Sequence, residues 1–190
     1  MELNGANRLT VISVGLPDLR YQSAKLVKGE KTSAAITEMI KVIEEAKKID
    51  RRLEEWCHGL SDAWAGKVGK VVTEEPKHIT NAFFWPGPQF LYQDLNIAHI
   101  ITDYRVCRLF CQAIIRECIS AIPTSAHTEH LQRTFTEAIY ISQQVVNDFC
   151  SSVPYFLGFG MEHRSDCTTP SDRKCKLSFA LFTHMPLTNV

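Results

Sequence analysis

The sequence predicts an all-α protein, an antiparallel helical bundle with a long central buried helix and an irregular aromatic loop. Apolar residues recur at three- and four-residue steps over residues 32–57, and a broader apolar pattern runs from residue 94 to residue 122. A third helical pattern covers about residues 127–150. The short connection before it predicts an antiparallel neighbour of the preceding helix. We expect one helical domain over residues 1–190.

The N-terminal part divides into a poorly defined segment and a clear amphipathic helix. Residues 1–30 show little pattern beyond a turn at Leu16-Pro17 and a short helix around residues 18–28. Thr32 or Ser33 can cap the next helix, which presents apolar residues on one face and charges on the other. We expect Gly59 to end this helix in the left-handed conformation.

Residues 59–93 form a long connecting loop in our interpretation. Val68, Val71 and Val72 allow a short strand, but glycine and proline bracket them closely. Aromatic residues gather between 83 and 92, where Pro86-Gly87-Pro88 argues against regular structure. An apolar loop of this kind is expected to lie in a groove or on a partner, because its exposure would promote association.

The central helix begins after Asp94, a residue suited to cap it, and ends before Pro123. Apolar residues surround most of its circumference, so we expect it to be largely buried. After the third helix, a polar loop is expected over residues 161–176. The apolar run from Leu177 to Met185 is then a terminal helix or a short strand, with helix favoured.

Composition narrows the function classes. Lys plus Arg and Asp plus Glu both number 21, so the net charge is zero and no basic excess for duplex binding exists. No segment approaches the roughly 20 continuous apolar residues of a membrane helix, and no signal peptide is visible. The seven cysteines are irregularly spaced, which favours reduced thiols in an intracellular protein.

Several side chains are candidates for chemistry, each with a structural alternative. Arg105 and Arg108 lie one turn apart and can bind the carboxylate or phosphate of a ligand. Pairing with Asp103, Glu117 or Asp148, or with helix-terminal carbonyls, is the favoured interpretation. The aromatic loop is equally consistent with a ligand pocket and with a plug at the end of the bundle.

Metal and cofactor sites are not predicted. His127 and His130 share a helix face, yet no further ligands have recognisable spacing. Cys107, Cys111 and Cys118 fit small buried residues better than zinc ligands. No nucleophile elbow or phosphate-binding glycine loop is present.

Three separated segments of the chain stand out when they are taken together. They are Leu53-Glu54-Glu55-Trp56 with Trp64; Tyr92-Gln93-Asp94-Leu95 leading to Tyr104-Arg105 and Arg108-Leu109; and Cys150-Ser151-Ser152-Val153-Pro154-Tyr155-Phe156-Leu157-Gly158. In this order they resemble the C-terminal regulatory (middle-homology-like) domain of fungal binuclear zinc-cluster transcription factors. The resemblance covers roughly residues 50–187 and implies an all-α fold in a nuclear setting, often in control of secondary metabolism. The cysteines contain no run like the family's zinc cluster, so this chain does not bind DNA by that device.

The resemblance supports a regulatory or interaction domain that binds a small hydrophobic metabolite and a protein partner, or forms a homodimer, and controls pathway gene expression. We expect this domain to make no direct contact with nucleic acid or membrane and to need no cofactor. The expected ligand-binding residues are Phe84, Trp85, Phe90, Tyr92, Tyr104, Arg105, Arg108 and Tyr155. We expect a nuclear protein by resemblance and a cytoplasmic one otherwise, either part of a longer factor or a stand-alone homologue.

The alternative function is an enzyme of fungal secondary metabolism, a stand-alone homologue that shapes a reactive intermediate in an apolar pocket. A cyclase or an isomerase would fit this description. The acid, base or clamp would then be His99, Asp103, Arg105 or His163.

Overall fold

The computed structural model describes residues 5–61, 64, 66–72 and 87–158. It confirms the helical fold class: these residues form five α-helices, a short 3-10 helix and one small two-stranded sheet. The predicted polar loop at 161–176 and the terminal apolar segment at 177–185 lie outside the described residues, as do Phe84, Trp85 and His163.

The chain divides into two compact units. The first combines the residues up to 65 with residues 99–148, and the second combines residues 66–98 with those from 149 onward. The first unit contains the helical bundle, and the second contains the sheet and the end of the last helix.

The N-terminal segment contains two helices, α1 (Gly5–Ser13) and α2 (Leu16–Lys28). The short helix expected around residues 18–28 is confirmed as α2, whereas α1 was not predicted. Pro17 lies in the first turn of α2, where its missing N–H costs no hydrogen bond. Both helices pack on α3 (Ser33–His58). The indole Nε1 of Trp56 donates a hydrogen bond to the carbonyl of Gly5 at 2.9 Å, which fastens α1 to the end of α3.

Helix α3 follows its predicted boundaries. The hydroxyl of Thr32 accepts a hydrogen bond from the amide of Ala35 at 3.2 Å, so the predicted N-cap is confirmed. Gly59 does end the helix, but its φ of −84° is not left-handed. The Gly59 amide instead continues the helical pattern and donates to the carbonyl of Glu55 at 3.0 Å, which removes the need for a positive φ.

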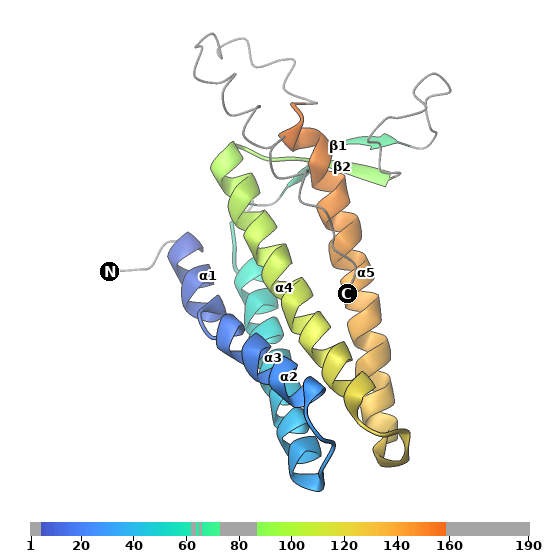
Figure 1. Cartoon of the computed structure of the whole chain (residues 1–190). Coiled ribbons are helices and arrows are strands. Elements are labelled where there is room, and N and C mark those ends of the chain that lie inside the picture. Colours follow the sequence, from blue (N-terminus) through green and yellow to red (C-terminus); the bar gives the residue numbers. More distant parts are fainter. Residues whose placement is uncertain (1–4, 62–63, 65, 73–86, 159–190) are drawn as a thin grey trace. The chain divides into compact units, whose positions relative to one another are not determined.

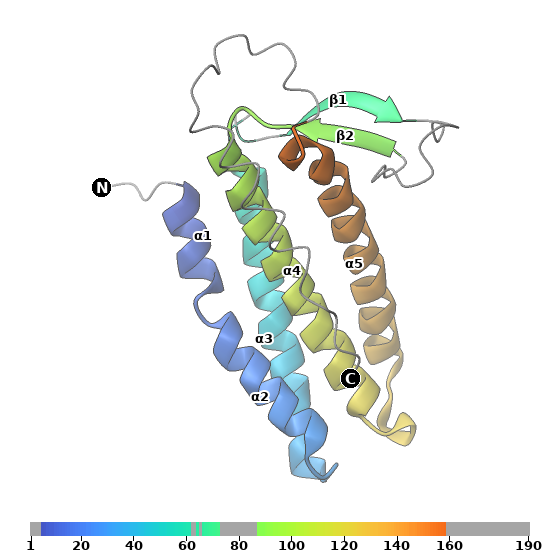
Figure 2. The same cartoon turned by 45° about the horizontal axis from the view of Figure 1, so that its top comes forward.

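The predicted central helix is α4 (Leu95–Ala121), capped as expected by Asp94, whose Oδ1 accepts from the amide of Ile97 at 2.9 Å. A 3-10 helix, η1 (Thr124–Ala126), connects it to α5 (Glu129–Phe156). Both views show α3, α4 and α5 side by side, each antiparallel to the next (Figures 1 and 2). The bundle core comprises mainly Met39, Ile43, Ala46, Leu53, Trp56, Cys111, Ile114, Cys118 and Ala138.

Helix α5 is longer than predicted, because it runs through Pro154 to Phe156 and does not stop near residue 150. A proline in a helix leaves the carbonyl four residues earlier, here that of Cys150, without its helical donor. Pro154 is only two residues from the helix end, so no further turn depends on it. The sequence Cys150 to Phe156 is therefore helical, in the second unit from Phe149 onward.

The predicted connecting loop contains an antiparallel hairpin of β1 (Lys67–Val72) and β2 (Gly87–Leu91). The strand suggested by the valines is confirmed, whereas the exclusion of regular structure at Pro86-Gly87-Pro88 was wrong for residues 87 and 88. Pro88 pairs with Val71 in a sheet of only two strands, where a proline can turn its missing donor outward.

The hairpin has an irregularity at Gly69, between the pairs Val68–Phe90 and Lys70–Gln89. A Cβ atom at Gly69 would lie 2.6 Å from the Cγ of Leu91, so only glycine fits without displacing that side chain.

Candidate functional site

Asp50 of α3 and Arg108 of α4 form a bidentate ion pair in the bundle. Nε of Arg108 donates to Oδ1 of Asp50 at 2.8 Å, and Nη2 donates to Oδ2 at 3.0 Å. Only about a tenth of either side chain is exposed, at 11% and 10%. Parallel N–H···O bonds between a guanidinium and a carboxylate are the strongest and most directional of the protein ion pairs.

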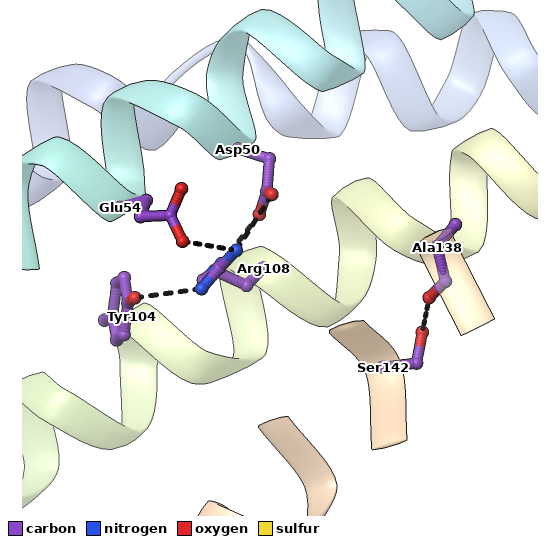
Figure 3. Close-up of polar contacts among 6 residues, drawn as sticks. All are labelled: Asp50, Glu54, Tyr104, Arg108, Ala138 and Ser142. Carbon is purple, nitrogen blue, oxygen red and sulfur yellow. Dashed lines mark hydrogen bonds and ion pairs between the residues drawn. The ribbon is translucent and has the colours of Figure 1, made fainter. Parts of the chain in front are cut away.

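Two further groups complete this cluster (Figure 3). Glu54, one turn along α3, places Oε1 3.6 Å from Nη2 of Arg108, and the phenol oxygen of Tyr104 accepts from Nη1 at 3.3 Å. The Tyr104 ring also packs on Trp56, with ring centroids 5.4 Å apart. Each of the three guanidinium nitrogens therefore has an acceptor. We call Asp50, Glu54, Tyr104 and Arg108 the Arg108 cluster.

The environment of Arg108 and Tyr104 favours one protonation state of each. Burial lowers the pKa of Arg108, but the hydrogen bonds and charge of Asp50 and the contact with Tyr104 outweigh it and leave the pKa above its usual value. Burial also raises the pKa of Tyr104, although the neighbouring Arg108 charge opposes that shift. Arg108 stays a guanidinium and Tyr104 a neutral phenol, so the cluster is a static anchor between α3 and α4.

A pocket of about 160 Å³ lies beside this cluster in the first unit, between α3, α4 and α5. Its lining consists of Lys47, Asp50, Arg51 and Glu54 from α3, Gln112 and Ile115 from α4, and Thr134, Glu137, Ala138 and Ile141 from α5. Seven of these ten residues are polar or charged. The pocket therefore suits a polar occupant.

Two lining residues are buried, and neither has a hydrogen-bonding partner for its side chain among the residues that the structure describes. Gln112 is 2% exposed and Thr134 is 5% exposed, and neither side chain makes a hydrogen bond within the described part of the chain. The polar atoms of both side chains remain accessible, because neither residue has a fully enclosed polar atom that lacks a hydrogen bond. The pocket is thus the route by which these two side chains meet solvent or a ligand.

The residues predicted to bind a ligand do not gather in this pocket. Tyr104, Arg105 and Arg108 belong to the first unit, but none lines it. Phe90, Tyr92 and Tyr155 belong to the second unit. The proposed common pocket therefore remains a prediction.

In the second unit, Tyr92 and Tyr155 contact each other edge to face, with ring centroids 5.3 Å apart. The Tyr92 hydroxyl is 2.7 Å from the hydroxyl of Ser152, and all three residues are buried. Phe90, in β2, is only partly buried. Two tyrosines that the sequence singled out, Tyr92 and Tyr155, thus form part of a packed interior.

The charges of the two arginines that the sequence singled out both act on the expected partner Asp148, where they oppose the rise in pKa that burial causes. Arg105 is buried. Arg108 pairs with Asp50, which was not among the expected partners Asp103, Glu117 and Asp148. Glu117 instead forms an ion pair with Arg20 of α2. Of the alternative catalytic residues, His99 and Asp103 are exposed.

Sequence reasoning missed Asp50, Gln112 and Thr134. A signal for Asp50 was present, because it lies four residues after Ala46 and three before Leu53, within the apolar stripe of α3. A carboxylate at such a position needs a cationic partner from a neighbouring helix. Gln112 lies between Cys111 and Ile114 in the same way, but an amide has no distinctive partner that a sequence reveals.

The histidine pair has structural contacts. Nε2 of His127 lies 3.0 Å from the carbonyl oxygen of Ile122 and 3.2 Å from that of Ile119, and so binds the C-terminal end of α4. Nε2 of His130 lies 3.9 Å from Oε1 of Glu44. Within residues 5–61, 64, 66–72 and 87–158, no group of three metal-ligating side chains occurs, and no helix has the length and apolarity to cross a membrane.

Comparison with known proteins finds similarity to a fungal transcription factor. Over 155 residues the chain is 28% identical to Transcription factor dbaG of Emericella nidulans, which covers 80% of this chain and 35% of that protein. No protein-family model and no solved structure matches the chain. The chain is therefore similar, along most of its length, to a region that makes up about a third of a fungal transcription factor.

Proposed function

We propose that this chain is a regulatory region of a fungal transcription-control protein, acting in the nucleus through a protein partner and responding to a small molecule. One observation carries the proposal: the similarity to Transcription factor dbaG extends over 80% of the chain. A relationship that spans several helices indicates a shared folded region and not a shared short motif.

The charge balance supports an indirect mode of action. With 21 basic and 21 acidic residues, the chain lacks the excess positive charge that attracts proteins to duplex DNA. We therefore propose that contact with DNA belongs to another segment or to a partner. The resemblance to zinc-cluster regulators, which often control secondary metabolism, fits such a division of labour.

The effector is the second part of the proposal. The sequence predicted a hydrophobic metabolite held by aromatic residues, whereas the pocket in the first unit is lined mainly by polar residues. This lining supports a polar effector. Of the residues named for the catalytic alternative, His99 and Asp103 are exposed, Arg105 is buried, and His163 lies outside the described residues.

A tethering assay tests the regulatory role. The chain is fused to an unrelated DNA-binding domain, and transcription is measured from a reporter that carries the matching site in a filamentous fungus. We expect the fusion to change reporter output relative to the DNA-binding domain alone. The Arg133→Gln fusion is the matched control, because Arg133 is exposed on α5 and pairs only locally with Glu129. Unchanged output from a nuclear, intact fusion would contradict the proposal.

A further inference from the structure

The pocket between α3, α4 and α5 has the size for a small metabolite. Its volume of about 160 Å³ is close to that of an engineered cavity of about 150 Å³ that holds benzene. Unlike such a cavity, it presents an amide, a hydroxyl and several charges. Its occupant is therefore a small molecule with hydrogen-bonding groups.

The buried end of the pocket calls for hydrogen bonds. Gln112 and Thr134 are almost completely buried and make none within the described residues. A buried polar group without a hydrogen-bonding partner destabilises the protein. Water relieves part of this cost, and a ligand that carries its own hydroxyl or amide relieves it as well while contributing contacts with Ile115 and Ala138.

Among the charged residues at the rim of the pocket, one cation and one anion form no ion pair within the described residues. Lys47 is engaged by Glu44 at 3.1 Å, and Asp50 and Glu54 face Arg108. Arg51 of α3 and Glu137 of α5 also line the pocket, yet neither forms an ion pair within the described part of the chain, with each other or with any other residue. The two walls therefore offer a cation and an anion to a molecule that carries both charges.

We propose that this pocket binds an α-amino acid with a short, uncharged polar side chain. Arg51 binds the carboxylate, Glu137 binds the ammonium group, and the polar side chain reaches Gln112 and Thr134. A simple anion would leave Glu137 without a partner, and an apolar amino acid would leave the two buried groups unsatisfied. The binding itself is argued from the pocket alone. The role of the amino acid as an effector rests on the proposed function.

Isothermal titration calorimetry on the purified full chain tests the proposal. The probes are L-asparagine, L-glutamine, L-serine and L-threonine. The comparison compound is L-norvaline, which has the same α-ammonium and carboxylate groups but an apolar side chain. We expect at least one polar probe to bind about tenfold or more tightly than L-norvaline, as the loss of a buried hydrogen bond implies.

Variants assign the binding to this pocket. Gln112→Leu and Thr134→Val keep the approximate side-chain volume, and each is expected to weaken binding by about tenfold. Their helicity and melting temperature are measured alongside, to show that they fold. Arg51→Gln alters only an exposed side chain, so it gives an answer even if the buried variants unfold, and we expect it to weaken binding too. Arg133→Gln, on the surface of α5, should bind as the unaltered chain does.

Three results would overturn the proposal: no heat of binding from any polar probe at millimolar concentration, equal affinity for L-norvaline, or full affinity in Arg51→Gln. The tethering assay contains no added ligand, and the calorimetry contains no DNA. A failure of amino-acid binding with an active reporter therefore rejects this effector alone, whereas a silent reporter with intact binding rejects the transcriptional role.

Discussion

At the scale of single residues, Arg108 makes the most demanding contact in the bundle, because it fixes a charge where little water reaches. Its removal leaves the carboxylate of Asp50 buried without a counter-charge. We expect Arg108→Met to lower the free energy of unfolding by about 3–5 kcal/mol, measured by urea denaturation.

The double variant Asp50→Leu/Arg108→Met is the control for this prediction, because it removes both charges and leaves none uncompensated. It should regain most of the lost stability, since a buried ion pair contributes little compared with apolar residues of similar size. A single variant as stable as the unaltered chain would show that Asp50 is satisfied by other means.

Cys118 provides a test at alkaline pH. Burial raises the pKa of its thiol from 9.0 to about 11, with a further contribution from Glu117 and an opposing one from Arg20. The folded protein thus holds this proton more tightly than the unfolded chain does. The stability that this difference contributes is fully present below pH 9.0, and it is lost as the pH rises from 9.0 to about 11.

Unfolding in urea across that pH range measures the effect. In Cys118→Ala the stability is lower throughout, because a cavity is left in the core, but its decline with pH should be shallower than in the unaltered chain. Identical slopes would contradict the assignment. Burial raises the pKa of Cys111 as well, and its thiol likewise loses its proton above pH 9.0 in the unfolded chain, so Cys118→Ala should keep a residual decline over the same pH range.

At the scale of secondary-structure elements, the N-cap of α3 is the contact most readily tested. The Thr32 hydroxyl satisfies the amide of Ala35, one of the donors that a helix start leaves unpaired. We expect Thr32→Ala to lower the free energy of unfolding by about 1 kcal/mol, measured by thermal or urea denaturation. Thr32→Ser keeps the oxygen and should cost much less. Equal losses in both variants would indicate that the methyl group matters and the cap does not.

The sequence revealed those elements whose causes are local. Thr32 and Asp94 were predicted as caps because an N-cap is formed by a side chain and an amide three residues later. Gly59 was assigned the wrong conformation because its amide continues the helical hydrogen bonding. Pro88 and Pro154 misled for a shared reason: a proline prevents one hydrogen bond, and an edge strand or a last helical turn can do without it.

The candidate site was less predictable, because it is made by helices distant in sequence. Arg108 was recognised as a residue in need of a partner, but Asp50 could be named only once α3 and α4 were aligned. The pocket depends on three helices, and Gln112 and Thr134 look ordinary in sequence. Helical periodicity predicts which face of a helix is buried, not which neighbour meets it.

At the scale of the whole molecule, charge balance governs the encounter with nucleic acid. Because the basic and acidic residues are equal in number, the chain as a whole has no excess of positive charge to attract phosphates and release counterions. We expect the purified chain to show no saturable binding to a fluorescent duplex in anisotropy measurements at low salt. Fusion to a DNA-binding domain supplies the positive control. Tight binding that weakens steeply with added salt would reveal a concentrated basic surface and contradict this prediction.

The pairing of Asp50 with Arg108 has a consequence for the uniqueness of the bundle. An apolar stripe such as Ala46, Ile49 and Leu53 can slide along a similar stripe with little penalty. Sliding α4 by one turn, about 5.4 Å, would separate the two charges and leave both stranded in the interior. The pair therefore selects a single alignment of α3 and α4 from several that apolar packing alone would accept. The charge-free double variant should keep its helicity while its amide resonances broaden, as helices without this constraint exchange between alignments.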